Sequence, residues 1–292
     1  MRRNAALKLL GALGAGAAAV RVAEFRRDRT VARRVDDLLS AADRRSGETF
    51  SADDLDGLPD PVRRYFETVL DEGQPSVRSV RLEQRGEFRL GGATGSWKPL
   101  AATQHFTVDP PGFVWDAEIE LFPLVSTRVV DAYAAGEGSL RATVLGAIPV
   151  AEAEPSPALN EGELLRYLAE AVWFPTALLP GRGVTWEAVD DRSARATVTD
   201  RGTTASLVFR FDDRNRVERV HAEGRYRAED DAFVPWTGYF RDYRERNGME
   251  IPTAAEVEWN LPEGDSSYWR ASVTEIDHRT GRGDADFDGD RE

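Results

Sequence analysis

Alternating apolar and polar residues dominate the middle of the chain. From Phe113 to Leu121 every odd position is apolar, and most even positions are acidic. A period of two is typical of a strand that buries one face. Further strands are expected at 79–90, 100–108, 124–134, 138–148, 183–189, 193–200, 204–211, 216–228, 233–243, 253–261 and 267–277.

Three segments instead show the spacing of amphipathic helices. Residues 25–45 keep apolar positions amid many charges, which predicts a connecting helix. The second helix is expected to start at Asp60 as N-cap, with Pro61 in the first turn, and to stop near Gly73. The third is expected at about 160–174, where Asn160 and Glu163 have the spacing of a capping box.

Helix, strands, helix and strands follow one another with connections too short for parallel crossovers. We therefore predict an α+β fold, mainly antiparallel β, with one strongly curved sheet (a half-barrel) that packs a central helix and is preceded by an N-terminal apolar helix. The predicted organisation is an apolar anchor or signal segment at 1–22, a charged helical linker at 23–57, a single domain at 58–279 and an acidic disordered tail at 280–292.

The N-terminal apolar run lies between Arg3 and Arg21 and contains seventeen residues. That length is at the short limit for spanning a bilayer. A single membrane anchor is the preferred interpretation; a cleaved signal peptide followed by secretion, or an interfacial helix, is the alternative. Arginines are more frequent after the run than before it, which favours a cytoplasmic body, although the sidedness stays open.

Charge and composition exclude several classes of function. The net charge of −13 disfavours nucleic-acid binding, and the absence of cysteine excludes thiol chemistry. Three histidines far apart in the chain give no metal site, and no motif predicts a cofactor. Arginine greatly outnumbers lysine, which fits either a GC-rich genome or, as we prefer, a salt-adapted (halophilic) acidic surface.

Several sequence strings resemble an uncharacterised bacterial and archaeal family that is known only as a domain of unknown function. The most specific strings are PPGFVWDAEI at 110–119 and YLAEAVWFPTALLP at 167–180, and the likeness covers roughly 58–278. The family implies no activity. The order of elements is also similar to the open half-barrels of lipoprotein carriers such as LolA, a likeness of fold and not of function.

Carboxylates supply the weak candidates for catalysis. Glu170 is expected in the middle of the central helix, just before Trp173, where burial at the mouth of an apolar pocket would raise its pKa. The preferred alternative is that Glu163, Arg166 and Glu170 form a solvated stripe with i, i+4 pairing. Asp116 and Asp131 are expected on neighbouring strands, where clustered carboxylates would bind calcium, supply an acid/base pair or, more simply, be part of a solvated face.

Aromatic and aliphatic residues provide the candidate ligand site. The residues expected to line an apolar cavity are Trp115, Trp173, Phe174, Leu178, Leu179 and Trp186. The leading hypothesis is a membrane-associated binder of a lipid-like or other apolar small molecule. A structural or partner-binding envelope protein is the second hypothesis. A carboxylate-dependent hydrolase is the third.

We expect the full-length protein to be recovered in the membrane fraction, because the run between Arg3 and Arg21 is just long enough to cross a bilayer. Cell fractionation followed by detergent extraction measures this. Uncleaved protein that stays soluble without detergent would rule out the anchor.

Overall fold

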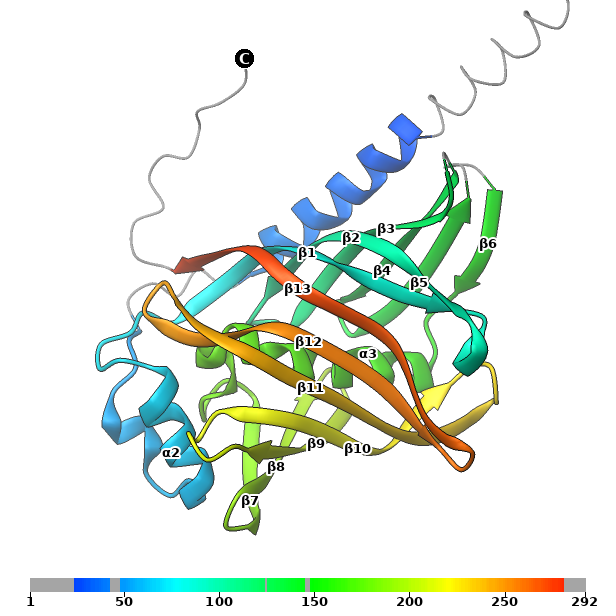
Figure 1. Ribbon diagram of the computed structural model, residues 1–292. Coiled ribbons are helices and arrows are strands. Elements are labelled where there is room, and N and C mark those ends of the chain that lie inside the picture. The colour runs from blue at the N-terminus through cyan, green and yellow to red at the C-terminus, as the bar shows by residue number, and fades with distance from the viewer. Residues whose placement is uncertain (1–23, 43–47, 124, 145–147, 281–292) are drawn as a thin grey trace, which may run out of the picture.

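One curved antiparallel sheet wrapped around a helix makes up most of the protein (Figure 1). The computed structural model describes residues 24–42, 48–123, 125–144 and 148–280. Within them thirteen strands form a single sheet in the order β6-β5-β4-β3-β2-β1-β13-β12-β11-β10-β9-β8-β7. The predicted fold class, a mainly antiparallel half-barrel that packs a central helix, is confirmed.

The elements occupy the following ranges. The first six strands are β1 Val77–Leu90, β2 Ser96–Thr107, β3 Gly112–Phe122, β4 Val125–Ala134, β5 Glu137–Val144 and β6 Ile148–Ala153. The other seven are β7 Val184–Asp190, β8 Ser193–Asp200, β9 Thr203–Phe211, β10 Val217–Arg227, β11 Ala232–Arg246, β12 Met249–Leu261 and β13 Gly264–Thr280. The helical elements are η1 Ala52–Leu55, α2 Asp60–Val69, η2 Gly92–Thr94, α3 Pro157–Glu170, η3 Ala171–Trp173 and η4 Pro175–Leu178, preceded by a helix at 24–41.

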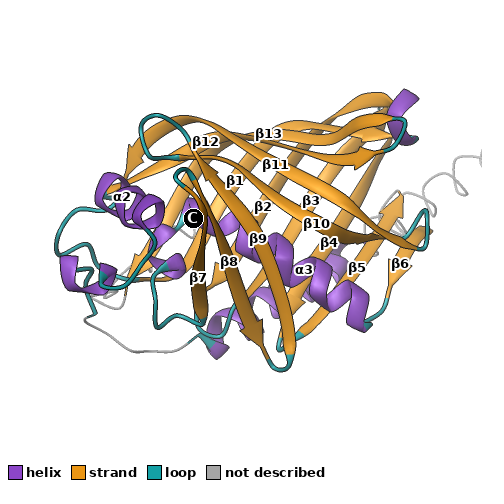
Figure 2. Cartoon of the chain, turned by 90° about the horizontal axis from the view of Figure 1, so that it is seen from below, coloured by secondary structure: helices purple, strands orange, loops and turns teal. Residues whose placement is uncertain are grey.

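The connection between the two halves of the sheet explains why α3 lies inside it. Strands β1 to β6 form one meander, β7 to β13 form another, and β1 pairs with β13 where the halves meet. The chain leaves the sheet at edge strand β6 and rejoins it at the opposite edge, β7, so α3 crosses the concave face between them (Figure 2). Because adjacent strands twist by about 20–25°, a sheet of thirteen strands curls around that helix.

Helix α2 lies at one end of the curved sheet (Figure 2). Its rings Tyr65 and Phe66 are fully buried and contact Phe211 and Trp186. The predicted N-cap is wrong by one residue: Pro59 is the N-cap, and Asp60 is the first helical residue. As the first helical residue, Asp60 accepts a hydrogen bond from the Arg63 guanidinium with its carboxylate.

The start of α3 also differs from the predicted capping box. The helix begins at Pro157, and the side chain of Ser156 caps it by accepting from the Leu159 backbone N–H at 3.2 Å. Asn160 is therefore inside the helix, where its side chain accepts from the Gly138 backbone N–H of β5. Any larger residue at Gly138 would place a Cβ 3.0 Å from the side chain of Glu163, so this glycine permits the close approach of helix and sheet.

Edge strand β6 was not predicted. Its residues from Ile148 to Glu152 are exposed, so no buried face imposes a period of two, and Pro149 weakens the strand signal. Such a strand is characteristic of a sheet edge. Strand β6 forms through its antiparallel pairing with β5.

The helix at 24–41 packs on the convex face of the sheet. Its buried residues Val31 and Leu38 join Val114, Val130 and Ala132 in a second, smaller apolar cluster. The segment that we expected to be a linker therefore covers β3 and β4 from outside. The apolar run at 1–22 and the tail from 281 lie outside the described residues, and among the described helices none is long and apolar enough to cross a membrane.

Trp173→Ala should lower the free energy of unfolding by about 3–5 kcal/mol, because the ring is fully buried and its removal leaves a large cavity. Urea denaturation measures the loss. As a control, Phe122→Ala removes a ring that is 69% exposed and should change stability by no more than about 0.5 kcal/mol. Similar losses in both variants would contradict the packing described here.

Candidate functional site

The residues predicted to bind an apolar ligand are mostly part of the core. Trp173, Phe174 and Leu178 are fully buried, and the Trp173 ring contacts Phe106 and Phe240 at centroid distances of 6.5 Å. Leu179 and Trp115 are also buried, whereas Trp186 is half-buried and donates from its indole to the Leu178 carbonyl. These side chains fill the interior of the protein. Their role in ligand binding stays a prediction.

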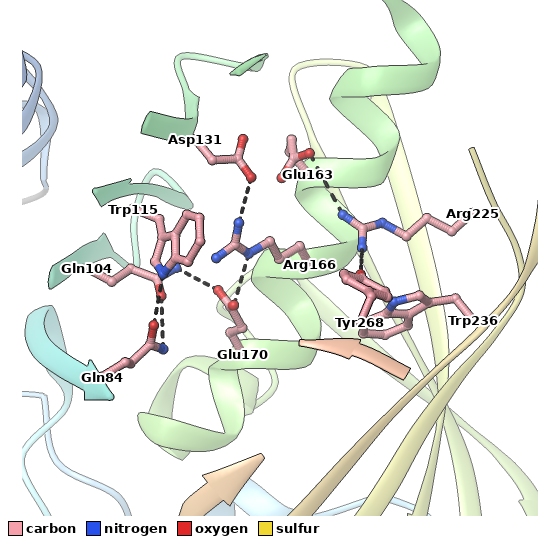
Figure 3. A network of polar contacts seen from close by, with 10 residues as sticks. All are labelled: Gln84, Gln104, Trp115, Asp131, Glu163, Arg166, Glu170, Arg225, Trp236 and Tyr268. Carbon is pink, nitrogen blue, oxygen red and sulfur yellow. Dashed lines mark hydrogen bonds and ion pairs between the residues drawn. The ribbon is translucent and has the colours of Figure 1, made fainter. Parts of the chain in front are cut away.

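A buried polar network connects α3 with the concave face of the sheet (Figure 3). Arg166 of α3 donates to Asp131 of β4 at 2.6 Å and to Glu170, one turn later in α3, at 2.9 Å. Its guanidinium also lies over the rings of Phe113 and Trp115 on β3, 4.8 and 4.9 Å from their centroids. A guanidinium between carboxylates and aromatic faces is held by ion pairs and cation–π attraction together.

The network continues through three side chains on β1, β2 and β3. Gln104 donates to Glu170 at 2.7 Å, and its carbonyl oxygen accepts from Gln84 at 3.4 Å. Gln84 in turn accepts from the Trp115 indole at 2.8 Å. Because each amide both donates and accepts, these polar groups are satisfied although they are buried in an apolar interior.

A second guanidinium, that of Arg225 on β10, lies on the other side of α3 (Figure 3). It donates to the Tyr268 hydroxyl at 3.3 Å and lies 3.8 Å from the Glu163 carboxylate. Tyr268 also accepts from the Trp236 indole at 3.0 Å. Arg225 lies over the rings of Trp236 and Trp259, at 5.3 and 5.8 Å. The ion pair of Arg225 is therefore much longer than that of Arg166.

The charge balance of the cluster determines how its acids titrate. Three carboxyl groups, Asp131, Glu163 and Glu170, share the interior with the two guanidiniums. Burial raises the pKa of all three, although the ion pair with Arg166 opposes the rise for Asp131 and Glu170. For Glu163 the charges of Arg225 and Arg166 oppose the rise, but burial together with the nearby Asp131 charge outweighs them and raises its pKa to about 8. This shift favours the protonated form of Glu163.

The three carboxylates singled out from the sequence divide between the two faces of the sheet. Asp131 pairs in register with Trp115 and joins Glu170 on the concave side, where the pKa of Glu170 is raised as expected. Asp116 is one position away, on the convex face, and pairs with Arg128. Asp116 and Asp131 therefore do not form an acid/base pair. The solvated stripe of Glu163, Arg166 and Glu170 is also wrong, because these side chains point into the half-barrel.

Arg225 and Tyr268 were missed because local irregularities hide them. The register of β10 shifts between Ala222 and Arg225, and that of β12 against β13 shifts near Tyr268. Each shift breaks the period of two from which the inward face was read. One sequence signal could have found them. Arg225 and Tyr268 each interrupt an alternating stretch, and each side chain combines an apolar stem or ring with a polar end.

Beside Arg225 lies a set of half-buried rings, Phe88, Trp259 and Tyr268, which we call the aromatic edge. The Trp259 and Tyr268 rings stack with centroids 5.7 Å apart, and Phe88 meets Tyr268 edge-on at 6.0 Å. These rings belong to β1, β12 and β13 and pack against the main core. The aromatic edge is thus partly accessible apolar surface that lies directly beside the Arg225 guanidinium.

Three surface pockets have volumes of about 220, 380 and 330 Å³, and Gln84, which lines the third, is the one residue of the polar network among their lining residues. The first two lie along the helix at 24–41, and the third lies over β1, β2 and β3. Within the described ranges no three His, Asp or Glu side chains are grouped as metal ligands. The arrangement on the concave side offers a ligand apolar contact, a cation and a carboxyl group whose pKa is raised.

Raising the pH from about 5 to 9 should destabilise the wild-type protein more than Glu163→Gln. The pKa of Glu163 is raised in the folded state, so the stability that its proton contributes is complete below the ordinary glutamate pKa and is lost as pH rises through about 8. The difference in slope is at most about 1.4 kcal/mol per pH unit. Urea denaturation across this range measures it. Glu161→Gln on the same helix should retain the wild-type slope, and an unchanged slope in Glu163→Gln would contradict the assignment.

Three solved structures are similar to this chain. A DUF1329 family protein from Desulfovibrio piger is 12% identical with a TM-score of 0.41, and the match covers 77% of this chain and 93% of that one. A LolA superfamily protein from Nitrosomonas europaea is 11% identical with a TM-score of 0.39, covering 75% and 92%. A β-barrel-like protein of the domain of unknown function DUF1849 from Brucella abortus is 10% identical with a TM-score of 0.21, covering 70% and 99%.

A comparison with curated proteins found no match. The family model of DUF6920, described as a family of unknown function, matches residues 56–278. This range is well over half of the chain and includes the strings at 110–119 and 167–180 on which the resemblance rests, so the resemblance is confirmed. The chain belongs to the DUF6920 family.

Proposed function

We propose that this protein binds an amphiphile with an anionic head and an apolar chain, with the head at Arg225 and the chain along the aromatic edge. The observation that carries the proposal is the weakly compensated charge of Arg225. Its ion pair with Glu163 is 3.8 Å long, and the raised pKa of Glu163 weakens that pair further because it favours the neutral acid. A ligand carboxylate would supply the counter-charge that Arg225 lacks.

The aromatic edge supports the second half of the proposal. Phe88, Trp259 and Tyr268 are half-buried, so an alkyl chain that covers them would remove further apolar surface from water at about 25 cal/mol per Å². The Arg225 guanidinium lies over Trp259, so head and chain subsites are adjacent. The proposed ligand site is therefore at Arg225 and the aromatic edge, and not in the fully packed region around Trp173.

Membrane association is part of the proposal and rests on the sequence alone. The apolar run at 1–22 is long enough to hold the half-barrel near a bilayer, which is the source of such amphiphiles. The partner is therefore a lipid-like small molecule. No nucleic acid is expected, because the net charge is −13.

A carboxylate-dependent hydrolase is the second candidate, favoured by one observation. Burial raises the pKa of both Glu163 and Asp131, and each has one buried carboxylate oxygen with no hydrogen-bond partner among the described residues. Two interacting carboxyl groups that share a buried site are suited to general acid catalysis. Both groups are enclosed between α3 and the sheet, however, and this favours ligand binding over turnover.

Dodecanoic acid should bind the wild-type protein at least about tenfold more tightly than 1-dodecanol, because the carboxylate gains a charged hydrogen bond worth about 1.5–3 kcal/mol. Arg225→Gln should remove this preference and leave the alcohol affinity nearly unchanged. Isothermal titration calorimetry and tryptophan fluorescence measure both affinities. Hydrolysis of an acyl ester by the wild-type protein would instead favour the second candidate.

Arg219→Gln is the matched control, since it makes the same charge change at an exposed position of the same strand. It should retain the preference for the acid. Acid and alcohol bound equally by the wild-type protein, or an acid preference that survives in folded Arg225→Gln, would contradict the proposed head-group site.

A further inference from the structure

The smallest of the three pockets has an unusual concentration of positive charge. It lies between the helix at 24–41 and the convex side of β4, β5 and β6, with a volume of about 220 Å³. Five arginines line it: Arg26, Arg27, Arg34, Arg128 and Arg141. No acidic residue is among the lining residues. In a chain with a net charge of −13, convergence of five guanidiniums at one place requires a physical explanation.

The acids around the pocket compensate only part of this charge. Asp28 and Asp116 both pair with Arg128, and Glu152 lies 3.6 Å from Arg141. Glu24 also interacts electrostatically with Arg27. Four carboxylates in the described part thus face five guanidiniums. The imbalance is unfavourable without a counter-ion, because like charges in a partly buried site repel one another.

Arg27 shows the imbalance most clearly. Its side chain is 19% exposed, and its Nε is buried with no hydrogen-bond partner in the described part of the chain. Its terminal nitrogens lie 3.5 Å from the Thr143 hydroxyl and 4.0 Å from Asp28, and the Glu24 charge also acts on it. Burial and the neighbouring Arg128 lower the pKa of Arg27. A buried donor without an acceptor is costly, and an anion in the pocket would satisfy it.

We propose that this pocket binds a phosphate group. Phosphate offers several acceptor oxygens in different directions, which suits arginines that approach from both the helix and the sheet. The volume of about 220 Å³ far exceeds the roughly 15 Å³ that one water requires, so there is room for such a group. Val31, Val130 and Pro149 complete the lining and provide an apolar wall for the rest of a phosphate ester.

Two sources of phosphate fit this chemistry, the headgroup of a lipid and a free phosphate compound. The sequence favours the lipid, because Arg26, the first residue that lines the pocket, comes only five positions after Arg21, which ends the apolar run. The site lies on the convex face, so it is separate from the proposed amphiphile site on the concave face and does not depend on it.

The first test is binding of inorganic phosphate to the full-length protein in detergent, measured by calorimetry and thermal shift against chloride at equal ionic strength. Wild-type protein should bind phosphate, and Arg27→Gln should weaken binding at least about tenfold. Arg33→Gln makes the same charge change on the same helix outside the pocket, and should bind as the wild type does. Equal weakening by both substitutions would show only general charge attraction and would overturn the proposal.

Arg141→Gln is a second variant of the pocket, and it keeps the test decisive if Arg27→Gln does not fold. The Arg141 side chain is 57% exposed, so its replacement should leave the circular dichroism spectrum unchanged while it weakens phosphate binding several-fold. Unchanged phosphate binding in this folded variant, or no phosphate binding by the wild-type protein together with no vesicle preference, would overturn the proposal.

Vesicles separate the two sources. If the ligand is a lipid headgroup, the wild-type protein should bind phosphatidylglycerol vesicles more tightly than phosphatidylcholine vesicles, and Arg27→Gln but not Arg33→Gln should remove that preference. Non-specific attraction does not explain such a result, since the chain is strongly acidic. If both vesicles bind equally while inorganic phosphate binds and depends on Arg27, the pocket takes a free phosphate compound.

Discussion

Arg166 connects the central helix to the sheet through ion pairs, hydrogen bonds and cation–π contacts. It pairs with Asp131 on β4 and Glu170 on α3, and it lies over Phe113 and Trp115 on β3. Burying this charge without partners would be prohibitive, so the position of α3 on the concave face is fixed by the need to satisfy it. The amide chain through Gln104 and Gln84 extends that constraint across β2 and β1.

Strict alternation along β3 and β4 gives the sheet two different faces. Phe113, Trp115 and Asp131 point inward to α3, whereas Val114 and Val130 point outward to the helix at 24–41. Each face of the sheet therefore packs against one helix, and arginine side chains gather on each face. Inside, Arg225 lies next to the aromatic edge. Outside, five arginines surround a pocket. Both proposals start from guanidiniums that are weakly compensated by the carboxylates nearest to them, Arg225 inside and the pocket arginines outside.

The architecture could be predicted from the sequence because it depends on local patterns. The period of two in β3, repeated along the chain, predicted a large antiparallel sheet, and the apolar face around Leu164 and Leu168 predicted a buried central helix. The site could not be predicted in the same way. The Arg166–Asp131 pair joins residues 35 positions apart, and which face Arg225 occupies depends on a register shift in β10. Exposed strand β6 carries no periodic signal at all.

A double-mutant cycle between Arg166 and Asp131 tests the central claim most directly. The free energies of unfolding of Arg166→Met, Asp131→Asn and the double variant would be compared with that of the wild type. We predict a coupling energy of about 1–3 kcal/mol, because each single change leaves a buried partner unpaired. The exposed pair Arg270 and Glu87 serves as the reference, with an expected coupling below about 1 kcal/mol. A coupling between Arg166 and Asp131 no larger than this reference would show that the buried ion pair does not hold α3 in the half-barrel.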